Sequence, residues 1–238
     1  MNKRAKKQKA IIFVIVLILA LIFVYPLFLI VMNSVKPLAQ ILTKPLSWPD
    51  VFQTENYVKA FKEVNVLHVM KNTAVLTIGS VAGITLLAAM TAYWTFRYQT
   101  KYSKVFETFV ILSMLIPFAS LMKVLGLNNS MFGTILTYWG IGLAFAFFMM
   151  QSAVKGLPVE LEESARIDGC SRTRIFFSII IPLLKPTIVS VVLMDMFWIW
   201  NDFMVPLIMM NNERLMTIQL SISRLFGQYA SKWDIALP

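Results

Sequence analysis

Apolar and polar residues alternate along this chain in long blocks rather than in short periods. A helix needs about 20 apolar residues to cross the hydrocarbon core of a bilayer, and several blocks approach or reach that length. The blocks lie at about residues 11–33, 72–94, 105–121, 131–153 and 179–206. The pattern therefore predicts an all-α integral membrane protein with about five spans.

Small residues and prolines in these blocks indicate how the spans pack. The second span is rich in small residues, which let neighbouring helices approach closely; they are Gly79, Ser80, Ala82, Gly83, Ala88, Ala89 and Ala92. Glycines in the fourth span favour helix packing over a binding site; they are Gly133, Gly140 and Gly142. Pro117 interrupts the third span, and Pro26 is expected to kink the first, as packed membrane helices tolerate.

Polar segments separate the blocks. Residues 34–71 predict an extracytoplasmic loop with a short helix around Asn56 to Val64. Residues 155–178 predict a polar helix-turn-helix, and an amphipathic helix is expected from Met216 to Phe226. Since the chain stops at Pro238, where a further span could begin, we expect a sixth helix to be absent from this sequence.

Composition and charge support a membrane protein and orient it. Of the 238 residues 58% are hydrophobic and 14% are charged, whereas about a quarter of a soluble domain is charged. Thirteen of the 22 basic residues lie in the N-terminal tail, after the second span, or between Lys155 and Lys185. Short basic segments stay in the cytoplasm, so the N-terminus is predicted there. The first apolar run is too long for a typical signal peptide.

Few residues offer site chemistry. The net charge of +10 lacks the aromatic interleaving of a nucleic-acid-binding face, so no nucleic acid is expected. A single cysteine, Cys170, excludes an intrachain disulfide and a multi-cysteine metal site. Because His68 is the single histidine, neither a histidine-rich metal site nor a catalytic triad is predicted. The sequence has no phosphate-binding loop, H-E-x-x-H or G-x-S-x-G motif. We predict no catalytic residue, metal or cofactor.

The polar segment at 155–178 carries the signals of a capped helix. Pro158 suits the first helical position, where its missing N–H costs nothing. Glutamates at 160, 162 and 163 follow, in the first two turns, where the helix dipole favours negative charge. Glu162 and Arg166 are four residues apart in the favourable order for an ion pair.

A turn and a second helix are expected to follow. Gly169 suits the left-handed position that ends a helix, and Ser171 can cap the next one. Pro182 is expected to bend the chain into the fifth span. Such a rigid, charged projection would suit the transmission of a displacement to or from another protein. The alternative, a helix lying on the lipid surface, is disfavoured because acidic residues face anionic lipids poorly.

The same segment resembles a known family. The spacing E-S-A-x-x-x-G from Glu163, nine residues, and I-x-I-P ending at Pro182 resembles the E-A-A loop of membrane subunits of binding-protein-dependent ABC importers. Ser164 and Cys170 stand where the family usually has alanine. Further segments resemble the sugar-importer branch and cover essentially the whole chain: Tyr25-Pro26, Ser34 to Lys36, Asn56-Tyr57, Asn72-Thr73, Ala92-Tyr93, Leu115 to Pro117, Pro158 to Glu163 and Trp200 to Phe203.

The resemblance implies a helix bundle like the type I ABC importer permeases, similar to the maltose-type inner-membrane component. Its predicted parts are a basic cytoplasmic tail at 1–10, a first span at 11–33, an extracytoplasmic loop at 34–71 and a permease core at 72–238. Two such subunits, usually unlike ones, form the pathway. A dimer of cytoplasmic ATPases powers it, and an extracytoplasmic solute-binding protein delivers the solute.

In that family the E-A-A loop inserts into the ATPase as a coupling helix. The resemblance assigns the ATPase-coupling role to Glu162, Glu163, Ser164, Ala165, Asp168, Gly169 and Pro182. Glu163 would pair with a basic group of the ATPase, Gly169 would make the tight turn, and Asp168 would stabilise it. The function implied is carbohydrate import. The alternatives are a truncated, non-transporting membrane scaffold or anchor, and an importer of a non-sugar solute.

The fifth span also contains polar residues and tryptophans. Carboxylates inside a membrane are costly and usually face a cavity or a partner. One interpretation is a translocation pathway in which a tryptophan stacks on a sugar ring; its candidates are Asp195, Trp198, Trp200, Asn201 and Asp202. The other is structural, with Asp195 against a polar group of the partner subunit and the tryptophans anchored at the outer interface.

Overall fold

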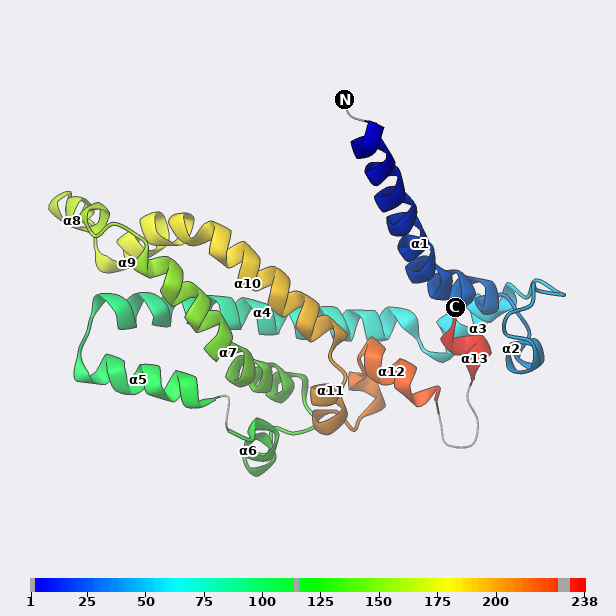
Figure 1. Ribbon diagram of the computed structural model, residues 1–238. Helices are drawn as coiled ribbons and strands as arrows, with labels where there is room; N and C mark the ends of the chain where they lie inside the picture. Colours follow the sequence, from blue (N-terminus) through cyan, green and yellow to red (C-terminus); the bar gives the residue numbers. More distant parts are fainter. Residues whose placement is uncertain (1–2, 114–115, 227–231) are drawn as a thin grey trace. The chain divides into compact units, whose positions relative to one another are not determined.

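The computed structural model describes residues 3–113, 116–226 and 232–238, and they are mostly helical (Figure 1). The helices are α1 (Lys3–Ser34), α2 (Leu38–Thr43), α3 (Glu55–Glu63), α4 (Val66–Arg97), α5 (Lys101–Leu112), α6 (Phe118–Val124), α7 (Met131–Lys155), α8 (Glu160–Ile167), α9 (Arg172–Ile175), α10 (Ile181–Asn201), α11 (Met204–Met209), α12 (Ile218–Arg224) and α13 (Trp233–Ala236). A π-helical turn, Phe176–Ile180, joins α9 to α10, and a short 3₁₀ helix, Glu213–Leu215, precedes α12. Residues up to His68 and from Ser221 onward form one compact unit, and Val69–Leu220 form another.

Within the described residues, four helical stretches are long and apolar enough to cross a membrane: Ile11–Ser34, Val66–Arg97, Met131–Lys155 and Arg172–Asn201. They correspond to four of the five predicted spans, the last of which was expected to reach Pro206 but ends at Asn201, before α11. The third predicted span is divided, because α5 ends at Leu112 and α6 begins after Pro117. Proline has no N–H to donate to a helical ladder, so a helix cannot run through it unperturbed. Leu115, part of the family resemblance, lies outside the described residues.

The predicted short helices are also present. The helix expected around Asn56 to Val64 is α3, and the amphipathic helix expected from Met216 to Phe226 is α12.

In the first unit, Lys36 is fully buried, and its ammonium donates to Asn33 Oδ1 at 2.9 Å and to Pro45 O at 3.1 Å. Burial lowers the pKa of Lys36, and the charge of Asp50 partly opposes that shift.

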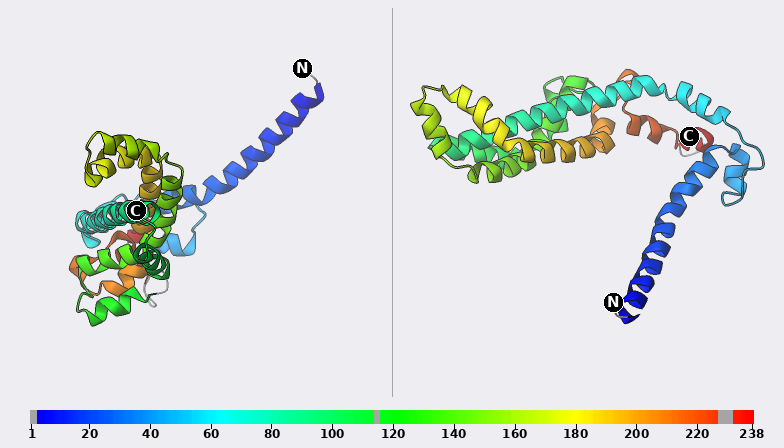
Figure 2. Two further views of the ribbon diagram at one scale, coloured as in Figure 1. Left: turned by 90° about the vertical axis from the view of Figure 1, so that its left-hand side faces the viewer. Right: turned by 90° about the horizontal axis from the view of Figure 1, so that it is seen from above.

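In the second unit, α7 packs closely against α10, and both helices cross α4 (Figures 1 and 2). The buried stripe of α10 is Leu184, Val191, Asp195 and Ile199, a spacing that keeps side chains on one face of a helix. The small residues predicted to permit close packing on α4 are buried at Ser80, Ala88, Ala89 and Ala92. Of the other three, Gly79 and Gly83 are half-buried and Ala82 is exposed.

One indole fills the gap that the α4 glycines leave. Trp139 of α7 lies across α4, and its Nε1 donates to Gly79 O at 3.1 Å. A Cβ atom at Gly83 would lie 1.9 Å from Cε2 of the same indole. On α7, a Cβ atom at Gly142 would lie 2.7 Å from Ile84 Cδ1. These contacts agree with the prediction that the glycines serve packing.

Candidate functional site

The predicted helix-turn-helix lies at one end of α7 and α10, while α11 lies at the other end (Figures 1 and 2). It consists of α8, a turn and α9. Helix α8 begins at Glu160, two residues later than Pro158 predicted. The amides of Glu162 and Glu163 both donate to the carbonyl of Val159, so Val159 supplies the first helical acceptor and Pro158 stays outside the helix. The predicted acidic first turn is present.

The end of α8 matches the prediction closely. Gly169 has a φ of +77°, in the left-handed region that favours glycine. The amide of Cys170 donates to Ala165 O at 2.9 Å, and the amide of Gly169 donates to Arg166 O at 3.0 Å. These two bonds form a Schellman motif, which satisfies carbonyls that the helix end would leave unpaired. Ser171 Oγ accepts from Arg174 N at 3.3 Å and caps α9, as predicted.

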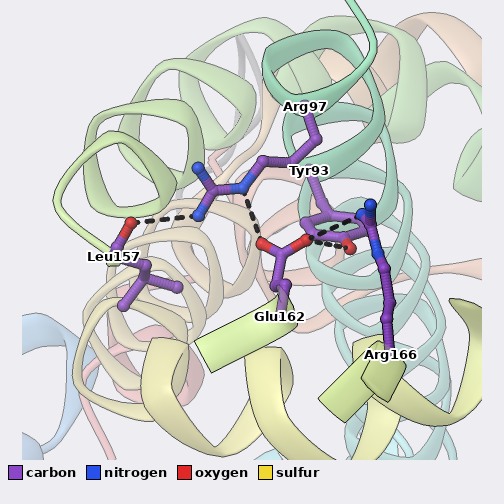
Figure 3. Close-up of polar contacts among 5 residues, drawn as sticks. All are labelled: Tyr93, Arg97, Leu157, Glu162 and Arg166. Atoms are coloured by element: carbon purple, nitrogen blue, oxygen red, sulfur yellow. Dashed lines mark hydrogen bonds and ion pairs between the residues drawn. The ribbon is translucent and has the colours of Figure 1, made fainter. Parts of the chain in front are cut away.

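The inner face of α8 carries a buried carboxylate. Glu162 is 1% exposed, and its Oε1 accepts from Arg97 Nε of α4 at 2.6 Å (Figure 3). Its Oε2 accepts from Tyr93 OH at 2.8 Å and lies 3.6 Å from Arg166 Nη2. Arg97 also donates through Nη2 to Leu157 O at 3.0 Å. The predicted pair with Arg166 is confirmed, but the stronger partners on α4 were not predicted.

A sequence signal for those partners exists. Tyr93 and Arg97 are four residues apart at the end of an apolar span, so they share one face of the helix. From the sequence, Arg97 counted only as one of the basic residues after the second span that orient the protein in the membrane. A tyrosine and an arginine on one helix face also suit a buried carboxylate, since both donate hydrogen bonds to it.

The outer face of α8 is exposed. Glu163, Ser164 and Asp168 all lie on the surface, and Ser164 Oγ donates back to Glu160 O at 2.8 Å. Ile167, the last residue of α8, which sequence reasoning did not single out, is 86% exposed. Of the residues assigned to coupling, Glu163, Ser164 and Asp168 are therefore free to meet a partner, whereas Glu162 and Ala165 face inward.

Pro182 lies at a local change in helix type. It is the second residue of α10, and the π-helical turn directly precedes that helix. In a regular α-helix the proline ring would clash with the carbonyl of Ser178, four residues earlier. The wider π turn accommodates the proline, so helix continues from α9 into α10.

The polar residues of the fifth span fall into different environments. Asp202 accepts from Tyr138 OH at 2.7 Å and from Met204 N at 3.0 Å, which fixes the start of α11. Asn201 Nδ2 donates within its own helix to Phe197 O. Trp198 packs edge-to-face on Tyr138, with ring centroids 5.7 Å apart. Asn201 and Asp202 thus form hydrogen bonds within the chain.

Asp195 and Trp200 keep features expected of a pathway. Asp195 is 3% exposed, and its Oδ2 has no hydrogen-bond partner among the described residues. Trp200 lines an apolar cavity of about 360 Å³ between α4 and α10, together with Thr77 and Met196. A buried, unpaired carboxylate oxygen is costly, and this cost favours a partner or solute at that point.

The fold and the loop together define a membrane transport subunit, and comparisons with known proteins agree. Residues 73–233 match a family described as the binding-protein-dependent transport system inner membrane component. A probable permease for starch degradation products, AmyC of Thermoanaerobacterium thermosulfurigenes, is 33% identical over 99% of this chain and 88% of its own length. The arabinooligosaccharide permease AraQ of Bacillus subtilis is 28% identical over 93% of this chain and 82% of its own length.

A solved structure shows the same fold. A bacterial ABC transporter involved in the import of the acidic polysaccharide alginate matches 100% of this chain and 92% of its own, with a TM-score of 0.83 and 21% identity. This chain belongs to the family of binding-protein-dependent inner membrane components. It is a multi-pass membrane permease with the type I ABC importer fold, and it is a transport component rather than an enzyme.

Proposed function

We propose that this chain is the membrane-spanning permease subunit of an ATP-driven importer of carbohydrates, either oligosaccharides or sugar derivatives. Two relatives are named for sugar polymers or their breakdown products, and a third, of Streptomyces coelicolor, for diacetylchitobiose uptake. Family membership favours transport over the scaffold alternative. The observation that carries the mechanism is the projection of α8, which presents an acidic outer face and continues through α9 into a membrane helix.

The projection acts as the coupling helix. Glu163 is exposed in the first turn of α8 and pairs with a basic group of a cytoplasmic ATPase. The Schellman turn at Gly169 makes the projection compact, so a push from the ATPase moves it as one body. Closure of the ATPase dimer on ATP draws two coupling helices together, and the spans then open toward a loaded solute-binding protein.

The complete transporter contains a second permease, and we infer that it is an unlike chain, so that the pathway is a heterodimer. The N-terminus of this chain faces the cytoplasm, on the side of most basic residues in short segments. We keep two residues as pathway candidates. Asp195 has a carboxylate oxygen without a partner among the described residues, and Trp200 lines the apolar cavity. Trp200 would stack on a sugar ring.

Cross-linking tests the docking role. A Ser164→Cys variant, in a chain whose Cys170 is replaced by serine, places one reactive thiol on the outer face of α8. In the intact complex we expect it to cross-link to the ATPase. The matched control is Val51→Cys in the same background, since Val51 is 62% exposed in the predicted extracytoplasmic loop and should not react with the ATPase. An intact complex with no cross-link from position 164 would contradict docking.

Transport assays test the solute. Cells with and without the gene are supplied with labelled oligosaccharides derived from starch, arabinan and chitin. We expect uptake of at least one of them to require the gene. Gene-dependent uptake of a non-sugar solute, with no effect on any carbohydrate, would contradict the carbohydrate assignment and leave the permease assignment intact.

A further inference from the structure

We propose that the buried ion pair between Arg97 and Glu162 is a positioning element, which ties the coupling helix directly to α4. Displacement of α8 then acts on α4 as well as on α7 and α10, to which the α8–α9 segment is joined through the chain. The proposal rests on the proposed function, because it assumes that α8 receives the push of an ATPase.

The geometry is that of a two-point attachment (Figure 3). The Arg97 side chain is 8% exposed, and its guanidinium binds both the Glu162 carboxylate of α8 and the carbonyl of Leu157, in the segment that leads into α8. A planar guanidinium can hold two acceptors in fixed directions, whereas an ammonium is a point charge. The attachment therefore sets the orientation of α8 as well as its position.

Because this ion pair is buried, separating its two charges costs more free energy than separating an exposed pair. The pair of Glu162 with Arg166, four residues along the same helix, involves an arginine that is 51% exposed, and such exposed pairs contribute little. Separating Glu162 from Arg97 would leave a charge buried without compensation. Helix α8 thus cannot easily leave α4, and the two move together.

Tyr93 strengthens the same connection. Its hydroxyl donates to Glu162, and its ring lies 5.3 Å from the ring of Phe176 in the π-helical turn. One turn of α4 therefore contacts both α8 and the start of the helix that leads into α10. The pair takes no part in the docking surface, because Glu162 is buried against α4 on the opposite side of α8.

The test measures coupling and assembly separately, in the complete transporter reconstituted in liposomes. The variants are Arg97→Gln, Glu162→Gln and the double substitution, each compared for solute transported per ATP hydrolysed. We expect each single variant to lower that ratio about tenfold, a typical size for coupling between sites. Cross-linking from Ser164→Cys should persist, because the docking face is unchanged.

Non-additivity identifies the pair as one unit. The double variant should be no worse than either single one, since the interaction is already lost. Arg97→Lys keeps the charge but not the two-point geometry, so it should give an intermediate ratio. Lys104→Gln removes an exposed cation from neighbouring α5 and should leave the ratio within about twofold of the parent.

Several outcomes would overturn the proposal. An unchanged transport-to-ATP ratio in both single variants would do so, and so would losses that multiply in the double variant. If the single variants do not assemble, Tyr93→Phe, which removes only one hydroxyl, is tested in their place. A ratio of solute transported per ATP hydrolysed that is unchanged from the parent would then show that the cluster serves folding alone. Failure of the Ser164→Cys cross-link in the otherwise unaltered complex would instead refute the proposed docking.

Discussion

A single backbone position, Gly169, decides how the coupling projection turns. Its φ of +77° lies where an L-residue brings its Cβ close to the following carbonyl oxygen, at a cost of about 1–2 kcal/mol. Apart from the adjacent residues of the chain, no heavy atom lies within 4 Å of a Cβ added there, so the restriction comes from the local backbone and not from crowding by other elements. The two hydrogen bonds of the Schellman motif depend on that φ.

We predict that Gly169→Val reduces transport more than it reduces insertion into the membrane. Valine is branched at Cβ and disfavours the left-handed region, so the end of α8 should unwind at a cost of about 1–2 kcal/mol. The readouts are uptake of the transported sugar and the amount of assembled complex. Gly156→Ala is the matched control, because Gly156 has a φ of −80° and an added Cβ would come no closer than 3.4 Å to any neighbour. Equal losses from both variants would contradict the argument.

Glu162 and Glu163 show what the sequence can and cannot establish at the scale of a residue. Both glutamates were assigned to coupling from the motif, and the favourable pair with Arg166 was visible in the spacing. One residue along a helix turns a side chain by about 100°, which here separates a buried carboxylate from an exposed one. Which of the two faces inward depends on Arg97, 65 residues away in the chain, and no local pattern contains that contact.

At the scale of elements, the sequence predicted the helices better than their junctions. Long apolar runs fix the existence of α4, α7 and α10, because a membrane span must satisfy its backbone hydrogen bonds within the helix. The prolines were harder to interpret. Pro158 suggested a helix start two residues too early, and the π-helical turn before Pro182 was not predicted. Because proline lacks an N–H, the backbone around it can adopt several conformations, and packing against the rest of the protein selects one of them.

Packing between α4 and α7 depends more on Gly83 than on Gly79, which lies four residues earlier on α4. We predict that Gly83→Ala destabilises the transporter by about 1–3 kcal/mol, the usual cost of inserting a methyl group into a filled core. The new Cβ would lie 1.9 Å from the Trp139 indole, which is rigid and bonded to Gly79 O. The measurement is the apparent melting temperature of the purified complex.

Two further variants make this prediction specific. At Gly79 the nearest atom to an added Cβ is Ile135 Cδ1 at 2.9 Å, the end of a flexible side chain, so Gly79→Ala should cost clearly less. Combining Gly83→Ala with Trp139→Leu should cost less than the sum of the separate changes, because the smaller side chain relieves the clash. Additive losses would mean that the two residues do not compete for one space.

At the scale of the whole molecule, charge distribution and fold answer different questions. The helices long enough to span a membrane would be equally apolar in either orientation. Orientation comes from the basic residues, of which 13 of 22 lie in short segments assigned to one side. The five in residues 34–71 oppose that bias, but the rule acts mainly through short segments. The coupling role of α8 requires the same orientation, because ATP is used in the cytoplasm.

We therefore predict opposite labelling of two engineered cysteines by a membrane-impermeant maleimide. Both are made in a chain whose only cysteine, Cys170, is replaced by serine. Lys101→Cys, at the exposed start of α5, should react in inverted membrane vesicles and be protected in intact cells. Val51→Cys, between α2 and α3, should show the reverse. Labelling of both positions after detergent treatment controls for reactivity. Reaction of Lys101→Cys from outside intact cells would place α8 on the side away from ATP, and the coupling mechanism would then fail.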